Sequence, residues 1–170
     1  MAERVVRKFK NIIDLPESKL QTALASSINT NYIFTSFASD EDIVALGLLQ
    51  DQGIVLRPDA FPPVPGDQAG GGTATMDING TLIVSIWSRL WVDQAGRDVS
   101  WLRHSTLGVS TLIDGVIAAL EQYDPLIAGD YALVEPMRLL APGFKFPMKR
   151  VGEWGKVEAT YSFHWWEDCS

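Results

Sequence analysis

One glycine-rich stretch has the spacing of a phosphate-binding loop. Residues 66–73 read Gly-Asp-Gln-Ala-Gly-Gly-Gly-Thr. A phosphate loop needs a lysine where Gly72 stands, because the lysine ammonium reaches the β- and γ-phosphates. A phosphate-binding loop also lies between a strand and a helix, whereas residues 66–73 precede a predicted strand. We therefore interpret residues 66–73 as a flexible hinge.

The other residues that could perform catalysis or bind a metal are scattered. His104 and His164 are the only histidines and fall on different predicted elements, with Asp98 and Glu167 as candidate acidic companions. No spacing resembles a metal-binding helix motif. Ser110 lacks the second glycine of a nucleophile elbow. The remaining candidates form no visible acid–base pair: Asp93, Asp98, Asp114 and Asp168. We expect no catalytic, metal-binding or cofactor-binding site.

Tryptophan is more informative, with six residues in 170. Four lie on the two strands that the pattern predicts most strongly: Trp87, Trp91, Trp165 and Trp166. Alternation along residues 81–92 places apolar side chains on both faces, with Ile83, Trp87, Arg89 and Trp91 on one and Leu82, Val84, Ile86, Leu90 and Val92 on the other. A sheet that is apolar on both faces must be covered on both.

Two explanations for this doubly apolar sheet stay open. The tryptophans can pack beneath the chain's own helices. Alternatively, a neighbouring subunit covers the second face, since Trp and Arg are enriched at interfaces. The second explanation makes interface candidates of Trp87, Arg89, Trp91 and Trp166.

Periodicity predicts the elements that position these residues. In the first third we expect two helices: a short one carrying Val5, Val6, Phe9, Ile12 and Ile13, and a second that begins at Asp14 and has the apolar stripe Leu20, Leu24 and Ile28. A strand at 32–37 follows. We then expect a helix that is capped by Ser39 and ends near Gly53, and a strand at 54–56. Further on we expect a hairpin turn at Asn79-Gly80 joining 73–78 to 81–92, a long helix from Val99 or Ser105 to Tyr123, an edge strand at 130–140 and a final strand at 156–166. This order predicts an α+β domain: a mainly antiparallel sheet with helices on one side.

A long proline- and glycine-rich segment interrupts the pattern at residues 58–73. It contains four prolines and four glycines in sixteen positions, which makes regular structure improbable. Loops of this length are usually functional or disordered. We expect a mobile loop that makes assembly contacts, with Phe61 and Val64 as apolar anchors for a partner groove.

Composition limits the function classes. The 170 residues are 46% hydrophobic and 21% charged, which fits a single globular domain over residues 1–170. The net charge of −7 argues against a broad basic surface for nucleic acid. A lone cysteine, Cys169, excludes a disulfide framework, and no apolar run is long enough for a membrane span. Charges at the start, including Arg4, Arg7 and Lys8, oppose a signal peptide. We expect a soluble protein of a reducing compartment or of a particle assembled there.

The order of elements is similar to that of tail terminator proteins of tailed bacteriophages. The similarity rests on the strand Ile83-Val-Ser-Ile-Trp-Ser-Arg89, a polar gap, the helix with Leu107, Leu112, Ile113, Val116 and Leu120, and two strands ending in the alternating run from Val157 to Trp165. It covers about residues 16–56 and 80–166, and leaves residues 1–13 as an N-terminal extension.

This resemblance implies a structural virion protein without enzyme activity, located in the tail or neck and assembled in the host cytoplasm. It implies a ring, of six copies in the family, that ends the tail tube. The implied partners are further copies of the chain, the tail tube protein and a head–tail connector or neck protein. DNA would pass through without specific binding.

Two alternatives stay open. One is a head-side neck or minor capsid protein. The other is a small-molecule-binding or enzymatic α+β domain, in which residues 58–73 form a lid and the tryptophans a pocket wall.

Overall fold

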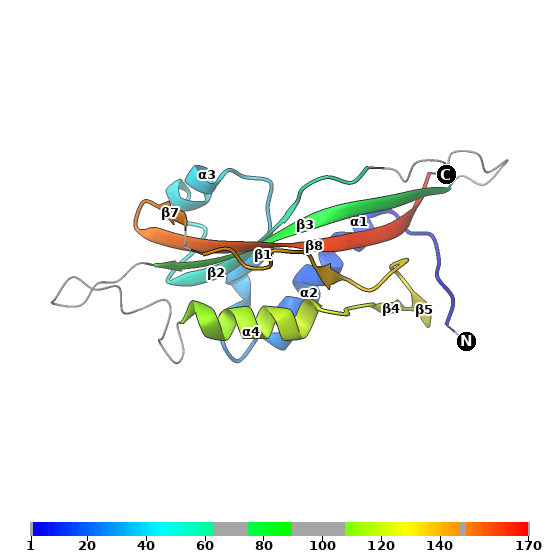
Figure 1. The fold of residues 1–170 in the computed structure, drawn as a ribbon, viewed down its shortest axis with the longest axis horizontal. Helices are drawn as coiled ribbons and strands as arrows, with labels where there is room; N and C mark the ends of the chain where they lie inside the picture. The colour runs from blue at the N-terminus through cyan, green and yellow to red at the C-terminus, as the bar shows by residue number, and fades with distance from the viewer. Residues whose placement is uncertain (1, 63–74, 90–107, 147–148, 170) are drawn as a thin grey trace.

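The computed structural model describes residues 2–62, 75–89, 108–146 and 149–169 (Figure 1). In chain order its elements are α1 (Phe9–Ile12), α2 (Asp14–Ala23), the 3-10 turn η1 (Thr30–Tyr32), β1 (Ile33–Thr35), α3 (Asp40–Ala45), β2 (Gln52–Pro58), β3 (Thr75–Arg89), α4 (Val109–Leu120), β4 (Leu126–Ile127), β5 (Asp130–Tyr131), β6 (Arg138–Leu139), β7 (Lys149–Val151) and β8 (Trp154–Asp168). The fold is α+β, as the sequence predicts. None of the helices described could cross a membrane, because all are too short and insufficiently apolar.

A six-stranded, mostly antiparallel sheet organises the fold. Its strands follow the order β1-β2-β3-β8-β6, and β7 also pairs with β8. Only the β1–β2 pair is parallel. Strands β3 and β8 pair along their whole lengths, from Thr75 opposite Asp168 to Arg89 opposite Trp154. This long twisted pair gives the molecule its elongated shape (Figure 1).

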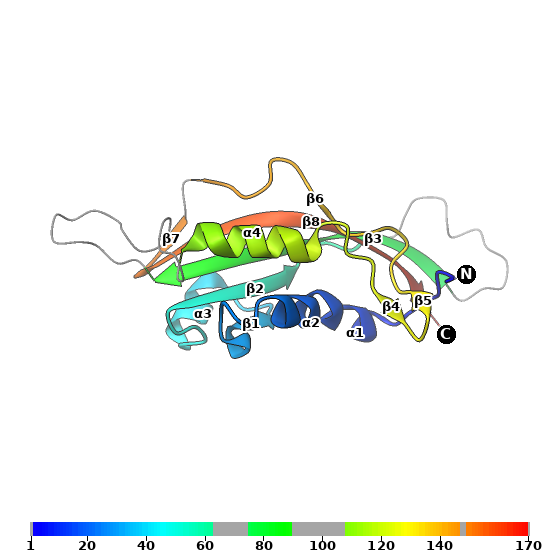
Figure 2. The same ribbon diagram turned by 90° about the horizontal axis from the view of Figure 1, so that it is seen from below.

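The two faces of the sheet are covered by different helices. Helices α2 and α4 lie on one face, which we call the inner face, whereas α3 and the β7 hairpin lie on the other, the outer face (Figures 1 and 2). The expectation that all helices lie on one side is therefore wrong for α3. The position of α3 on the outer face follows from the order of the elements, because α3 forms the crossover connection between the parallel strands β1 and β2.

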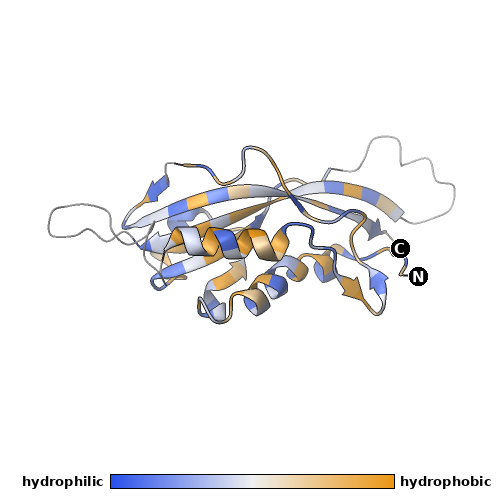
Figure 3. Cartoon of the chain, turned by 60° about the horizontal axis from the view of Figure 1, so that its bottom comes forward, coloured by the Kyte–Doolittle hydropathy of each residue, from blue (hydrophilic) through white to orange (hydrophobic). Residues whose placement is uncertain are grey.

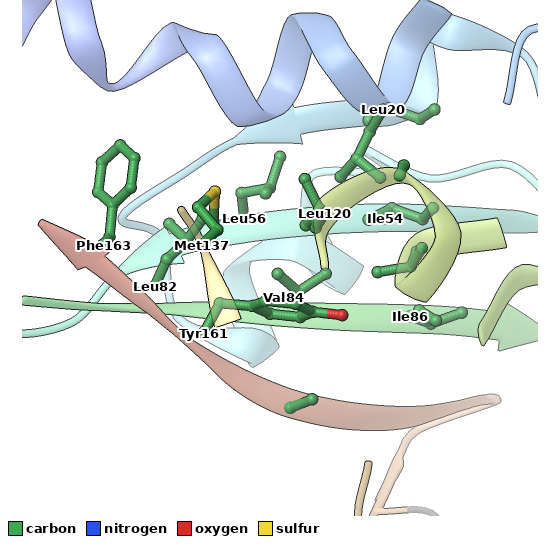
Figure 4. Close-up of a cluster of buried hydrophobic side chains, with 14 of the residues drawn as sticks. Leu20, Ile54, Leu56, Leu82, Val84, Ile86, Leu120, Met137, Tyr161 and Phe163 are labelled. Carbon is green, nitrogen blue, oxygen red and sulfur yellow. The ribbon is translucent and has the colours of Figure 1, made fainter. Parts of the chain in front are cut away.

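The main core lies between the inner face and the two longer helices. Strand β8 contributes its alternate residues, all buried: Val157, Ala159, Tyr161, Phe163 and Trp165. Helix α4 contributes the buried stripe Val109, Leu112, Val116, Ala119 and Leu120. Figure 4 shows Tyr161, Phe163 and Leu120 converging with labelled side chains of α2, β2 and β3. Figure 3 shows apolar residues concentrated on α4 and alternating with polar ones along the long strands. The two periods in the sequence therefore mark the inner face correctly.

Two predicted helix starts are confirmed. Helix α2 begins at Asp14, with Pro16 and Leu20 buried. Ser39 caps α3: its Oγ accepts a hydrogen bond from the Asp42 backbone N at 3.2 Å and donates one to the Asp42 carboxylate at 2.8 Å. Helix α3 ends at Ala45 rather than near Gly53, because Gly47 takes a φ of +62° that ends the helix.

Residues 2–8 do not form the expected helix around Val5 and Val6. They run extended across the end of the molecule where both termini lie (Figure 2). The Val5 N donates to the Tyr131 O, and the Arg7 N donates to the Trp166 O at 2.8 Å. Backbone bonding to β5 and β8 therefore overrides the helical spacing of the apolar residues, and only Phe9–Ile12 is helical.

The Asn79-Gly80 pair is not a hairpin turn, because β3 runs straight through it. Gly80 is required for another reason. A Cβ at this position would lie 1.9 Å from Phe61 Cδ1 and 2.5 Å from the Ala60 carbonyl oxygen. The glycine therefore lets residues 60–62 pass close beside β3, and backbone bonds such as Thr81 N to Ala60 O at 2.9 Å hold them there.

The predicted strand at 130–140 is also interrupted. Its ends form β5 and β6, which belong to different sheets. The intervening residues turn inward, where Ala132, Leu133 and Met137 are buried in the main core. Pro136 lies within this interruption and cannot donate a strand hydrogen bond.

Candidate functional site

The candidate interface residues direct attention to the outer face. We divide it into a proximal half, residues 82–89 of β3 with 154–161 of β8, and a distal half, residues 75–81 with 162–168. Helix α3 and the β7 hairpin cover the proximal half (Figure 1). Five buried residues form a second apolar cluster there: Ile43, Leu49, Val55, Trp87 and Trp154.

Trp87 belongs to this second cluster and is fully buried. The prediction that Trp87 contacts a neighbouring subunit is therefore wrong: the chain's own α3 covers it. The doubly apolar pattern of β3 was read correctly, but α3 supplies the second cover. Its position across the sheet depends on the crossover, which local spacing does not reveal.

A group of charges lies beside this cluster, centred on Asp40 at the first turn of α3. The Asp40 carboxylate lies 2.7 Å from the Lys156 Nζ, 3.0 Å from the Lys149 Nζ and 3.3 Å from the Arg57 Nη2. Lys156 also bonds the Glu158 carboxylate at 2.8 Å. The Lys156 side chain is only 2% exposed. These contacts join α3 to β2, β7 and β8.

The charges around Asp40 determine its protonation. Burial by itself raises the pKa of this carboxyl, but hydrogen bonds and attraction from Lys156 and Lys149 outweigh burial and lower the pKa from 3.8 to about 2. The same contact raises the pKa of Lys149, mainly through its hydrogen bond to Asp40. Both groups are therefore charged at neutral pH, and the group acts as an electrostatic clamp that holds α3 on the sheet.

The distal half of the outer face carries mainly polar side chains. His164 pairs with Asp77 across the β3–β8 ladder, and Asn79 and Thr81 follow along the same face. Trp166 is partly exposed and lies opposite Asp77. Among the interface candidates, Trp166 therefore remains accessible to a partner.

Arg89 is exposed at the proximal end of β3. Its guanidinium lies 3.7 Å from the Glu153 carboxylate and 5.9 Å from the centre of the Trp154 ring. These contacts are within the chain, yet 44% of the Arg89 side chain is exposed. Arg89 therefore stays a candidate contact, separated from Trp166 by the length of the strand pair.

Phe61 contacts the chain's own core. Its ring lies 5.0 Å from that of Trp165, 5.5 Å from Phe9 and 6.0 Å from Phe163, centre to centre. This aromatic cluster packs Phe61 against β3 and β8 and leaves it partly buried, so its contact with a partner groove stays a prediction. Val64 and Trp91 lie outside the described residues, as do His104, Asp98 and most of the 58–73 loop.

One pocket of about 170 Å³ opens beside β8, lined by Ile83, Leu140, Ala141, Pro142, Gly143, Lys145, Glu158, Ala159 and Thr160. It is small compared with the roughly 300–1,000 Å³ of typical ligand pockets. None of the described tryptophans lines it: Trp87 and Trp154 lie in the second cluster and Trp165 in the main core. Within the described part of the chain, no three metal-binding side chains come together.

The sequence interpretation missed two features of this region. The clamp at Asp40 joins residues more than one hundred positions apart, so no local spacing indicates it. The exposure of Phe37 and Leu46 on either side of α3 was missed because the predicted strand at 32–37 and the predicted helix ending near Gly53 include these residues in regular elements. The positive φ of Gly47 ends that helix, and a helix-ending glycine was the available signal.

The sequence was compared with known proteins, and neither a protein-family model nor a curated protein matches it.

Proposed function

We propose that this chain is a structural virion protein: a tail terminator that forms a ring, ends the tail tube of a bacteriophage and joins it to the neck. Its partners would be further copies of itself, the tail tube protein and a head–tail connector or neck protein. DNA would pass through the ring without being bound specifically.

The observation that carries this proposal is the arrangement of the segments that bear the resemblance. The strand ending in Ile86-Trp87-Ser88-Arg89 pairs along its length with the alternating strand up to Trp165, and α4 packs on the inner face of the same sheet. The segments that resemble tail terminators therefore form the central unit of the fold and are not separate elements.

The basic residues near the N-terminus are consistent with a conduit that does not bind DNA. Arg4 forms an ion pair with Asp124 at 3.1 Å and stacks 5.0 Å over the Tyr131 ring. The Arg7 guanidinium donates to the Ile127 carbonyl at 3.1 Å. Each of these guanidinium groups is held by contacts within the chain, so phosphate binding would have to compete with those contacts.

Electron microscopy of the purified protein tests the proposal. We expect closed rings with an open centre, and a labelled copy should lie between head and tail in assembled particles. A label on the head side of the neck would instead favour the minor capsid alternative. A protein that stays monomeric at every concentration, or that is found away from the neck, would contradict the proposal.

A further inference from the structure

The backbone edges of the sheet are occupied by the chain itself. At β1, the Glu17 carboxylate accepts from the Thr35 N at 2.9 Å, and the Gln21 side chain donates to the Ile33 O at 2.9 Å. At β6, the Glu121 carboxylate accepts from the Leu139 N at 2.7 Å. Side chains thus bond the outward-facing backbone groups at these positions. At these positions a neighbouring copy would therefore have to bind through side chains.

Large apolar side chains are exposed beside both edges. Phe37 and Leu46, which flank α3, are 72% and 68% exposed. Leu140 and Phe146, which follow β6, are 37% and 52% exposed. Aromatic residues such as Phe37 and Phe146 are enriched in the cores of protein interfaces.

The charges around these two apolar pairs are opposite. Residues 37–46 contain three acidic residues and no basic one, and residues 138–150 contain four basic residues and no acidic one. Asp40 and Lys149 already pair with each other inside the chain. Glu41 and Asp42 remain exposed on the first segment, and the second segment exposes Arg138, Lys145 and Arg150.

The segments touch where Lys149 of β7 contacts Asp40 of α3, but their exposed apolar residues lie toward opposite edges of the sheet. Phe37 follows β1, the first strand in the sheet order, and residues 140–146 follow β6, the last. Figure 2 shows α3 beside β1 and the segment after β6 along the other edge. Two different, complementary surfaces at opposite edges suit head-to-tail contacts, which close into a ring when the rotation allows.

We infer that the surface formed by Phe37, Glu41, Asp42 and Leu46, the acidic surface, binds the surface formed by Arg138, Leu140, Lys145 and Phe146, the basic surface, of a second copy of this chain. The inference rests on the proposed ring and names its subunit contact. Phe37 and Phe146 are the apolar anchors, and the charges set the register and exclude pairing of two like surfaces.

Reciprocal charge reversal tests this contact. One variant reverses the basic surface (Arg138→Glu with Lys145→Glu), and the other reverses the acidic surface (Glu41→Lys with Asp42→Lys). Each variant alone would bring like charges together, so we expect the concentration for half-assembly to rise about tenfold or more in sedimentation experiments. A 1:1 mixture should assemble again, because alternating the two variants restores opposite charges at every contact.

Two further variants serve as a control for charge reversal and as a separate test of the apolar anchor. Asp114→Lys with Glu135→Lys reverses two exposed charges elsewhere and should leave assembly unchanged. Phe37→Ser removes an anchor without touching the α3 cap and should weaken assembly even if the Asp42 substitution destabilises the helix. Circular dichroism must show native folding for each variant.

The outcomes separate this contact from the proposed function. A wild-type ring that neither reversed variant nor Phe37→Ser weakens would overturn the contact and leave the ring standing. A closed dimer that the mixture restores would support the two surfaces and overturn the ring. A wild-type protein that never assembles would overturn both.

Discussion

Asp40→Asn should destabilise the folded chain through the electrostatic clamp on the outer face. The substitution keeps the shape of the side chain and removes the charge that Lys156 contacts at 2.7 Å. Breaking a buried ion pair by removing one partner typically costs about 3–5 kcal/mol. Glu158 remains as a second partner for Lys156 at 2.8 Å, so we expect the lower end, about 3 kcal/mol at pH 7.

The effect should depend on pH in a defined direction. The pKa of Asp40 is lowered in the folded state, from 3.8 to about 2, so its charge stabilises the fold above pH 3.8 and this contribution is lost as the pH falls through about 2. At about 1.4 kcal/mol per pH unit, the contribution is roughly 2 kcal/mol. The difference in unfolding free energy between wild type and Asp40→Asn should therefore shrink by about that amount between pH 5 and pH 2.

Urea unfolding monitored by tryptophan fluorescence, at several pH values between 7 and 2, measures this difference. Asp114→Asn, which removes an exposed carboxylate on α4, is the matched control for the loss of one negative charge. A cost that stays constant over the whole pH range, or one below about 1 kcal/mol at pH 7, would refute the assignment of Asp40 as the charge that holds α3 on the sheet.

Three other substitutions or assays give separate tests. Trp87→Ala should lower the unfolding free energy by about 3–5 kcal/mol and leave the association of the remaining folded protein unchanged. If the variant instead loses association and keeps its stability, Trp87 is an interface residue and not a core residue. Gly80→Ala should cost about 1–3 kcal/mol in thermal unfolding, because the new Cβ meets the Phe61 ring and a backbone oxygen; an unchanged melting temperature would show that Phe61 does not pack there. Duplex DNA should show no measurable binding near 150 mM salt, whereas micromolar binding that disappears when Arg4 and Arg7 are neutralised would indicate a DNA-handling role.

The parts of the fold that the sequence predicts are those with a strong local period or cap. The alternation of β8 identified its buried face residue by residue, because a strand places alternate side chains on opposite faces. Ser39 predicted the start of α3 because its hydroxyl bonds a backbone group only three residues away.

The errors arise where distant residues decide the local structure. The extended N-terminal segment is held by Tyr131 and Trp166, both far along the chain, and not by its own spacing. Asn79-Gly80 has the composition of a turn, but its glycine accommodates Phe61. The burial of Trp87 depends on which face the α3 crossover takes, and no local pattern contains that information.

The candidate site also has features that local sequence patterns predict and features that depend on distant residues. The sequence predicted the two strands that carry the interface candidates, and Arg89 and Trp166 are exposed or partly exposed on them. The clamp around Asp40 and the positions of the exposed apolar residues beside the first and last strands could not be predicted without the sheet order. The numbers of charged residues in the two segments can be counted in the sequence, but the positions of the segments in the fold cannot be predicted from it.

The most direct test of the central claim is the mass of the assembled protein in solution. Native mass spectrometry, with analytical ultracentrifugation over a wide concentration range, should detect one discrete closed species of more than two copies, with six expected from the family resemblance. The two charge-reversed variants should each lose this species and regain it when mixed. A protein that remains a monomer at the highest attainable concentration would contradict the account.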